Sequence, residues 1–110
     1  MTNILINVWY PVEKAGDVYE KFLEVEKIFP MDPNLIKPVF PWGTYATNDG
    51  LKGAGIFEVR DDDFEKGIAY FVRRLNKYKN EVDGYTYEIA ASADNDKGKT
   101  LLSKKLKDFI

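Results

Sequence analysis

The sequence predicts a ferredoxin-like α+β fold with the element order β-α-β-β-α-β. Two segments of helical periodicity alternate with segments of period-two hydrophobicity, and Asp49-Gly50 separates two β-prone runs as a tight hairpin turn would. The 110 residues suit one domain, with its core over about residues 3–92 and an added helix over about 99–110. Right-handed crossovers place the first strand in the middle of the sheet, between the third and the fourth.

The first half of the chain supplies a strand, a helix and a segment interrupted by prolines. Residues 3–10 alternate β-branched residues with more polar ones, which is typical of a strand. A helix is expected over about 14–29. Four apolar residues mark its buried stripe: Val18, Phe22, Val25 and Phe29. Because Pro38 and Pro41 cannot donate hydrogen bonds to a neighbouring strand, the next strand is an edge strand or begins late, near Gly43.

The second half supplies a hairpin arm, a helix and the last strand. A type I′ turn at Asp49-Gly50 would pair Thr47 with Lys52, and the arm would run over about 51–60. A helix is expected over about 64–80. Its apolar stripe consists of Phe64, Ile68, Phe71, Val72 and Leu75. Alternation over 85–92 then predicts a strand.

Composition and charge exclude several classes of protein. Sixteen basic and eighteen acidic residues give a net charge of −2, which argues against a general nucleic-acid or anionic-membrane binder. The chain has no Cys and no His, so disulfides, histidine or thiolate nucleophiles and histidine metal ligands are absent. The first ten residues lack a basic segment, and no apolar run is long enough to span a membrane. We therefore expect a soluble cytoplasmic protein without metal or cofactor.

Both helices must cover one face of the sheet, and the other face is too apolar to stay bare. Its apolar members are Leu5, Trp9, Tyr45, Ile56 and Ala90. Exposed apolar patches of this kind usually mark interfaces. We expect a second copy, the C-terminal helix or a ligand to cover this face.

The same open face carries the candidate site. Asn7 on the central strand is expected between Glu58 and Glu88. When two carboxylates lie close together, the charge of one raises the pKa of the other, which can then act as a general acid or base. Trp9 and Tyr45 would stack a flat substrate. Arg60 would hold an anionic group. In the purely structural alternative, Glu58 pairs with Arg60 or a lysine of a partner chain, and Asn7 hydrogen-bonds across a dimer.

The order of elements, the hairpin and the half-apolar open face over about residues 3–92 resemble the dimeric α+β barrel superfamily. The resemblance implies a homodimer in which two sheets face each other around a cavity. It also implies activities such as those of cofactor-free monooxygenases and small isomerases. Asn7 is placed like an Asn of haem-degrading members, but those use a His to bind iron, and this chain has none.

Three functions follow from these observations. The first is a homodimer whose barrel cavity binds an apolar or aromatic small molecule, with a cofactor-independent monooxygenase or isomerase as its enzyme form. The second is a non-catalytic structural or regulatory dimer. The third is RNA binding, because residues 52–59 resemble the third-strand octamer of RNA-recognition motifs. However, Ala54 and Ile56 occupy the positions whose aromatic side chains would stack bases, so we do not expect nucleic acid as a partner.

Overall fold

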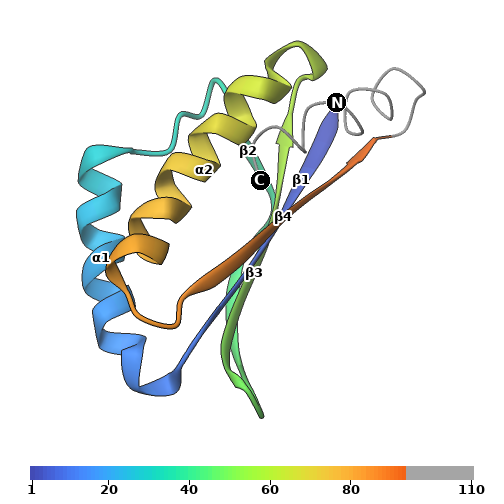
Figure 1. Cartoon of the computed structure of the whole chain (residues 1–110). Helices are drawn as coiled ribbons and strands as arrows, with labels where there is room; N and C mark the ends of the chain where they lie inside the picture. Colours follow the sequence, from blue (N-terminus) through green and yellow to red (C-terminus); the bar gives the residue numbers. More distant parts are fainter. Residues whose placement is uncertain (94–110) are drawn as a thin grey trace.

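The computed structural model describes residues 1–93, which form a four-stranded antiparallel sheet with two helices on one face (Figure 1). The strands are β1 (Thr2–Tyr10), β2 (Lys37–Thr47), β3 (Gly50–Val59) and β4 (Thr86–Ala93). The helices are α1 (Ala15–Ile28) and α2 (Phe64–Glu81), which follow the 3-10 turns Val12–Lys14 and Asp61–Asp63. The strand order is β2-β3-β1-β4, so β1 lies between β3 and β4 as predicted. The expected C-terminal helix lies outside the described residues.

Helix α2 packs directly on the sheet. Four members of its predicted stripe are buried: Phe64, Ile68, Phe71 and Leu75. Gly67 permits the close approach, because a Cβ at this position would lie 3.3 Å from side-chain atoms of both Ile4 and Val59. The core therefore lies between α2 and the faces of β1, β3 and β4 that carry Ile4, Val59 and Ile89. Neither this helix nor α1, the two long helices of residues 1–93, could span a membrane.

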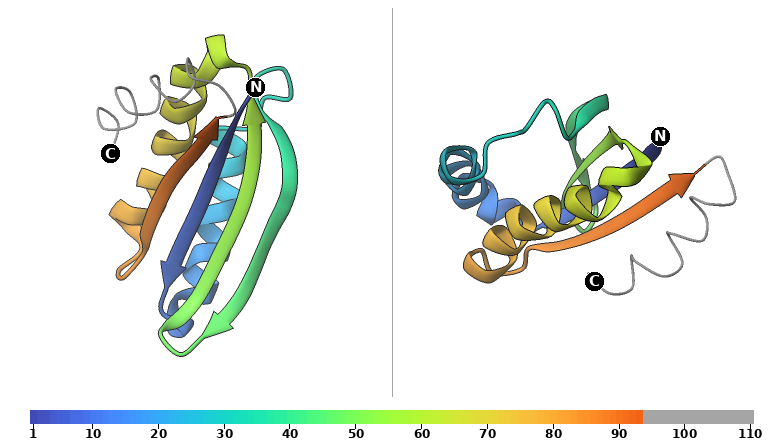
Figure 2. Two further views of the ribbon diagram at one scale, coloured as in Figure 1. Left: turned by 90° about the vertical axis from the view of Figure 1, so that its right-hand side faces the viewer. Right: turned by 90° about the horizontal axis from the view of Figure 1, so that it is seen from above.

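Helix α1 stands away from the sheet, and this differs from the sequence prediction. Val25 is its one fully buried residue, whereas Phe22, assigned to the buried stripe, is 45% exposed. In the view from above, α1 lies to one side of α2 and apart from the sheet (Figure 2). The helical period shows which side of a helix is apolar, but it does not show how closely another element covers that side.

The turn of the β2–β3 hairpin lies one residue earlier in the chain than predicted, so the pairing of the two strands shifts by two residues. Thr47 pairs with Gly50 rather than with Lys52, so the loop consists of Asn48 and Asp49. Neither loop residue has a positive φ, so the turn is not type I′. Instead, the Thr47 hydroxyl donates to the Gly50 carbonyl at 2.8 Å and accepts from the Asp49 N–H at 3.2 Å. These side-chain hydrogen bonds stabilise the alternative turn.

Strand β2 begins at Lys37, well before the position near Gly43 that the prolines suggested. It lies at the edge of the sheet, where a proline is tolerated because the backbone position without an N–H can face away from the neighbouring strand. The pairing with β3 shifts between Pro38 and Phe40 and again between Phe40 and Gly43. The edge-strand alternative is therefore correct, and bulges accommodate the prolines.

Candidate functional site

The structure separates the two carboxylates of the predicted site. Asn7 pairs with Glu88 of β4, as expected, but on its other side it pairs with Ala54. Glu58 lies opposite Asn3, four positions along β1, which is about 13 Å at 3.3 Å per residue. The expectation that both carboxylates flank Asn7 is wrong, because their registers against β1 differ.

Of the three predicted substrate-binding residues, Trp9 and Tyr45 lie near each other on the open face, whereas Arg60 does not join them. The Lys52 ammonium lies 5.2 Å from the ring centre of Trp9 and 5.8 Å from that of Tyr45. These two rings therefore share a cation on the open face. Arg60 follows the end of β3 and pairs with Asp63 at 3.1 Å, not with Glu58.

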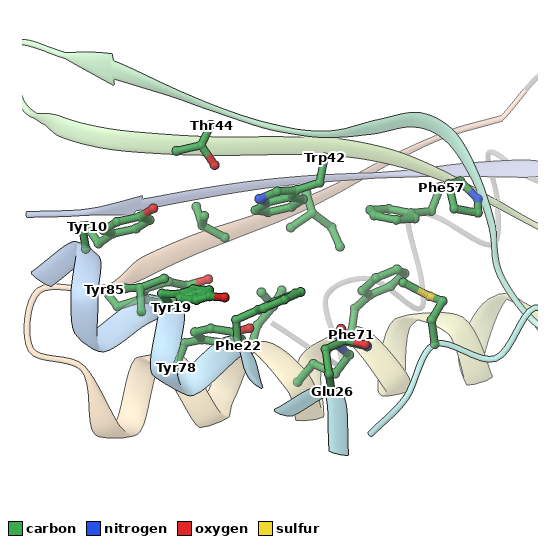
Figure 3. Close-up of a pocket in the computed structure, with 18 residues that line it drawn as sticks. Tyr10, Tyr19, Phe22, Glu26, Trp42, Thr44, Phe57, Phe71, Tyr78 and Tyr85 are labelled. Atoms are coloured by element: carbon green, nitrogen blue, oxygen red, sulfur yellow. Dashed lines mark hydrogen bonds and ion pairs between the residues drawn. The ribbon is translucent and has the colours of Figure 1, made fainter. Parts of the chain in front are cut away.

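A cavity lies on the other side of the sheet, between α1, α2 and the strands (Figure 3). Its volume is about 570 Å³, within the range of small-molecule sites. None of the six residues of the predicted site is among those that line it. The cavity exists because α2 lies close to the sheet while α1 does not.

Trp42 of β2 forms one wall of the cavity, and two glycines of β3 make room for it. A Cβ at Gly53 would lie 2.5 Å from the indole, and one at Gly55 would lie 2.9 Å from it. The indole can therefore lie against the backbone of the neighbouring strand. Gly43, the next residue of β2, has no atom within 4 Å of an added Cβ, so only the β3 glycines are needed for this contact.

Phenylalanines from three different elements complete the apolar walls. Phe22 comes from α1, Phe57 from β3 and Phe71 from α2. The rings of Phe57 and Phe71 are in contact, with centroids 4.8 Å apart. Aromatic walls of this kind favour a flat apolar molecule.

Tyrosines line one end of the cavity. The ring of Tyr85, which precedes β4, stacks between Tyr10 and Tyr78, with centroid distances of 5.9 and 5.1 Å. Burial raises the pKa of Tyr78 to about 12 and also raises the pKa of Tyr85. Both side chains are therefore neutral hydrogen-bonding groups at ordinary pH.

An ion pair joins the two helices beside the cavity. Arg74 of α2 pairs with Glu26 of α1, and it also donates to the Phe29 carbonyl at 2.8 Å and the Tyr70 hydroxyl at 2.7 Å. Burial opposes the charged form of Arg74, but the hydrogen bonds that Arg74 donates to Glu26 and Tyr70, together with the charges of these two groups, outweigh it, so the net effect raises the pKa of Arg74. This cluster attaches α1 to α2 where α1 has little contact with the sheet.

Sequence reasoning missed this cavity although it assigned several lining residues to the correct face. Residues that were assigned to the apolar stripes of the two helices line the cavity, among them Val18, Phe71 and Leu75. The signal that could have revealed the cavity is the pair Gly53 and Gly55 on the helix-facing side of β3. Two glycines on a core-facing side leave a hollow that only a neighbouring strand or helix can fill.

No protein-family model and no curated protein matches the sequence. Among solved structures, the chain is similar to the de novo designed protein Foldit4, with a TM-score of 0.57 and 14% identity over 86% of this chain and 98% of that chain. A NipSnap family protein with unknown function from Agrobacterium tumefaciens str. C58 overlaps with a TM-score of 0.44 and 15% identity, over 84% of this chain and 88% of that one. The similarity to Foldit4 shows a shared fold, and the similarity to the NipSnap protein is too low to support a conclusion. Any proposal about function must therefore be based on the residues of this chain.

Proposed function

We propose that this protein binds a flat, apolar small molecule in the cavity between α1 and the sheet. The observation that carries the proposal is a cavity of about 570 Å³ whose walls are aromatic side chains from both helices and three strands. Protein interiors normally leave few voids larger than a water molecule. Phe22 and Trp42 remain 45% and 46% exposed at this cavity, and covering them with a ligand would remove that apolar surface from water.

Binding is favoured over catalysis by the chemistry of the lining. A cofactor-independent monooxygenase or isomerase needs a general base within reach of its substrate. Among the described residues that line the cavity, Glu26 is the one carboxylate, and it is engaged by Arg74. We therefore place the enzyme form second to a binding protein.

The homodimer is a separate part of the proposal. In a dimeric α+β barrel, two ferredoxin-like protomers would join their open sheet faces. Phe40 and Tyr45, which are 59% and 49% exposed, support such a contact. Because the cavity lies on the helix side, ligand binding and dimer formation can be tested independently.

A fluorescent probe tests the binding proposal directly. The neutral naphthalene dye 6-propionyl-2-(dimethylamino)naphthalene should gain fluorescence, with a shift of its emission to shorter wavelength, when it is titrated with the protein. Thr44→Trp should abolish this response, because Thr44 lines the cavity and the larger side chain would fill it. Tyr45→Trp is the matched control, since the next residue of the strand faces the opposite side. An unchanged response in Thr44→Trp would contradict the proposal.

A further inference from the structure

The charged groups of the cavity are already paired with each other. Of the described residues that line it, Glu26 and Arg74 carry charge, and they form one ion pair. Both terminal nitrogens of Arg74 are engaged, one by Glu26 and the other by the Phe29 carbonyl and the Tyr70 hydroxyl. A ligand with its own charge would find no free counter-charge here, and burying an unpaired charge is costly.

The tyrosine end of the cavity offers hydroxyl groups that no residue of the described range 1–93 engages in a hydrogen bond. Among the described residues, none forms a hydrogen bond with the hydroxyl of Tyr10, Tyr19, Tyr78 or Tyr85. Tyr78 and Tyr85 are only 7% and 5% exposed, yet both line the cavity and neither hydroxyl oxygen is fully buried. Figure 3 shows the hydroxyls of Tyr10, Tyr19 and Tyr85 directed from this end into the cavity.

These hydroxyls are suited to donate hydrogen bonds. Burial raises the pKa of Tyr78 and of Tyr85, so both phenols keep their protons well above neutral pH. A protonated phenol in an apolar site gains most from an acceptor oxygen placed opposite it, because a buried donor without a partner is unfavourable.

We infer that the ligand is an uncharged planar molecule that presents a hydrogen-bond acceptor, such as a carbonyl oxygen, to the tyrosine end of the cavity. The inference rests on the proposed binding function and adds the chemical class of the ligand. The aromatic walls accept the planar body, and the hydroxyl of Tyr85 faces the acceptor, with Tyr78 stacked beside it. The closed ion pair of Glu26 and Arg74 disfavours charged molecules.

Three naphthalene probes of similar size separate these features. Methyl 2-naphthoate is neutral and carries a carbonyl, 2-ethylnaphthalene is neutral and has no acceptor, and 2-naphthoate is an anion at pH 7.5. Each competes with the neutral dye for the cavity. We expect the ester to bind about fivefold more tightly than the hydrocarbon, and on the order of tenfold or more tightly than the anion.

Isosteric variants identify the donor. Tyr85→Phe, combined with Tyr78→Phe where one change is insufficient, should abolish the preference for the ester over the hydrocarbon while hydrocarbon binding persists. Tyr87→Phe is the matched control, because its hydroxyl donates to Asn76 at 2.7 Å and does not line the cavity. Equal affinity of the native protein for ester and hydrocarbon, or tighter binding of the anion, would overturn the inference. Failure of the dye itself to bind would instead overturn the proposed function.

Discussion

The indole of Trp42 lies against the backbone of Gly53 so closely that a Cβ there would come within 2.5 Å of its Cζ2 atom. Strand β3 thus presents bare backbone where β2 presents its largest side chain. The same Cβ would also lie 3.0 Å from Val8, a buried residue of the core. The wall of the cavity is consequently fixed by the absence of a side chain on the neighbouring strand.

Gly53→Ala should displace Trp42 and weaken binding of the neutral naphthalene dye. The added methyl group meets both the indole and Val8, so we expect a loss of about 1–2 kcal/mol in the free energy of unfolding, as for other overpacked sites. Urea denaturation and dye titration measure the two effects. Gly43→Ala on β2 is the control, since its Cβ would meet nothing within 4 Å. If both variants behave alike, the contact does not shape the cavity.

Arg74→Met should destabilise the protein and loosen α1. The substitution leaves Glu26 without its cation and removes one of the two hydrogen bonds that the Phe29 carbonyl accepts, the other being from the Tyr70 hydroxyl. Because Glu26 is half-buried rather than enclosed, we expect a loss of about 2–3 kcal/mol, below the value for a fully buried pair. Hydrogen exchange of the α1 amides should increase more than that of the α2 amides.

Arg73→Met provides the matched comparison for this experiment. Arg73 is the preceding residue of α2 and is exposed, so its substitution should leave the unfolding free energy nearly unchanged. Equal effects of the two substitutions would show that α1 is held by general packing rather than by the Arg74 cluster.

The strand order could be predicted from the order of the elements and the right-handed crossover rule, and the faces of β1, β3 and β4 could be predicted from local alternation. On β1, apolar residues alternate with residues of the open face, and the structure buries all three of them: Ile4, Ile6 and Val8. Register could not be predicted in the same way. Glu58 and Ala54 have the same parity on β3, so alternation places both on the open face without deciding which one lies beside Asn7.

The position of the cavity depends on a relationship that no local pattern contains. Phe22 has the spacing of a core residue, and only the tertiary structure shows that α1 stops short of the sheet. Trp42 lies between two prolines and a glycine, where the strand itself was hard to recognise. The site therefore depends on two features that periodicity could not predict. One is the distance of α1 from the sheet, and the other is the residue at which β2 begins.

Stability should fall in alkali because of Tyr78. Its pKa is raised from 10.0 to about 12 by burial, so above pH 10 the unfolded chain loses a proton that the folded chain keeps. The contribution is therefore complete below pH 10 and is lost as the pH rises toward 12. After discounting for solvent in the cavity, we expect a decrease on the order of 1–2 kcal/mol, measured by urea denaturation at pH 8 and pH 11.

Tyr78→Phe should reduce this alkaline loss, since phenylalanine has no proton to release. The comparison must be between variant and native protein, because burial also raises the pKa of Tyr85 and a hydrogen bond to Glu24 raises the pKa of Lys21. These two groups add their own contribution to stability, which is lost in alkali as well. That contribution is common to both proteins and cancels in the difference. A native protein and a Tyr78→Phe variant with parallel pH profiles would contradict the assignment.

The open face should carry the homodimer contact, and Ile56 is the residue with which to test it. Ile56 pairs with Leu5 on one side and Phe40 on the other, and Leu5 pairs in turn with Ala90. These four apolar residues form a row across all four strands. A lysine in the centre of this row would place like charges opposite each other in a symmetric contact, so Ile56→Lys should convert a dimer to a monomer.

Sedimentation at micromolar concentration measures this directly. We expect the native chain to sediment at twice its 12.7 kDa mass and Ile56→Lys at the monomer mass. Asn80→Lys, an exposed position near the end of α2 on the opposite side of the sheet, should remain dimeric and controls for added charge. The dye should bind to the Ile56→Lys monomer as well as to the native protein, because the cavity lies on the opposite side of the sheet. A native protein that sediments as a monomer would leave the open face without the partner proposed for it.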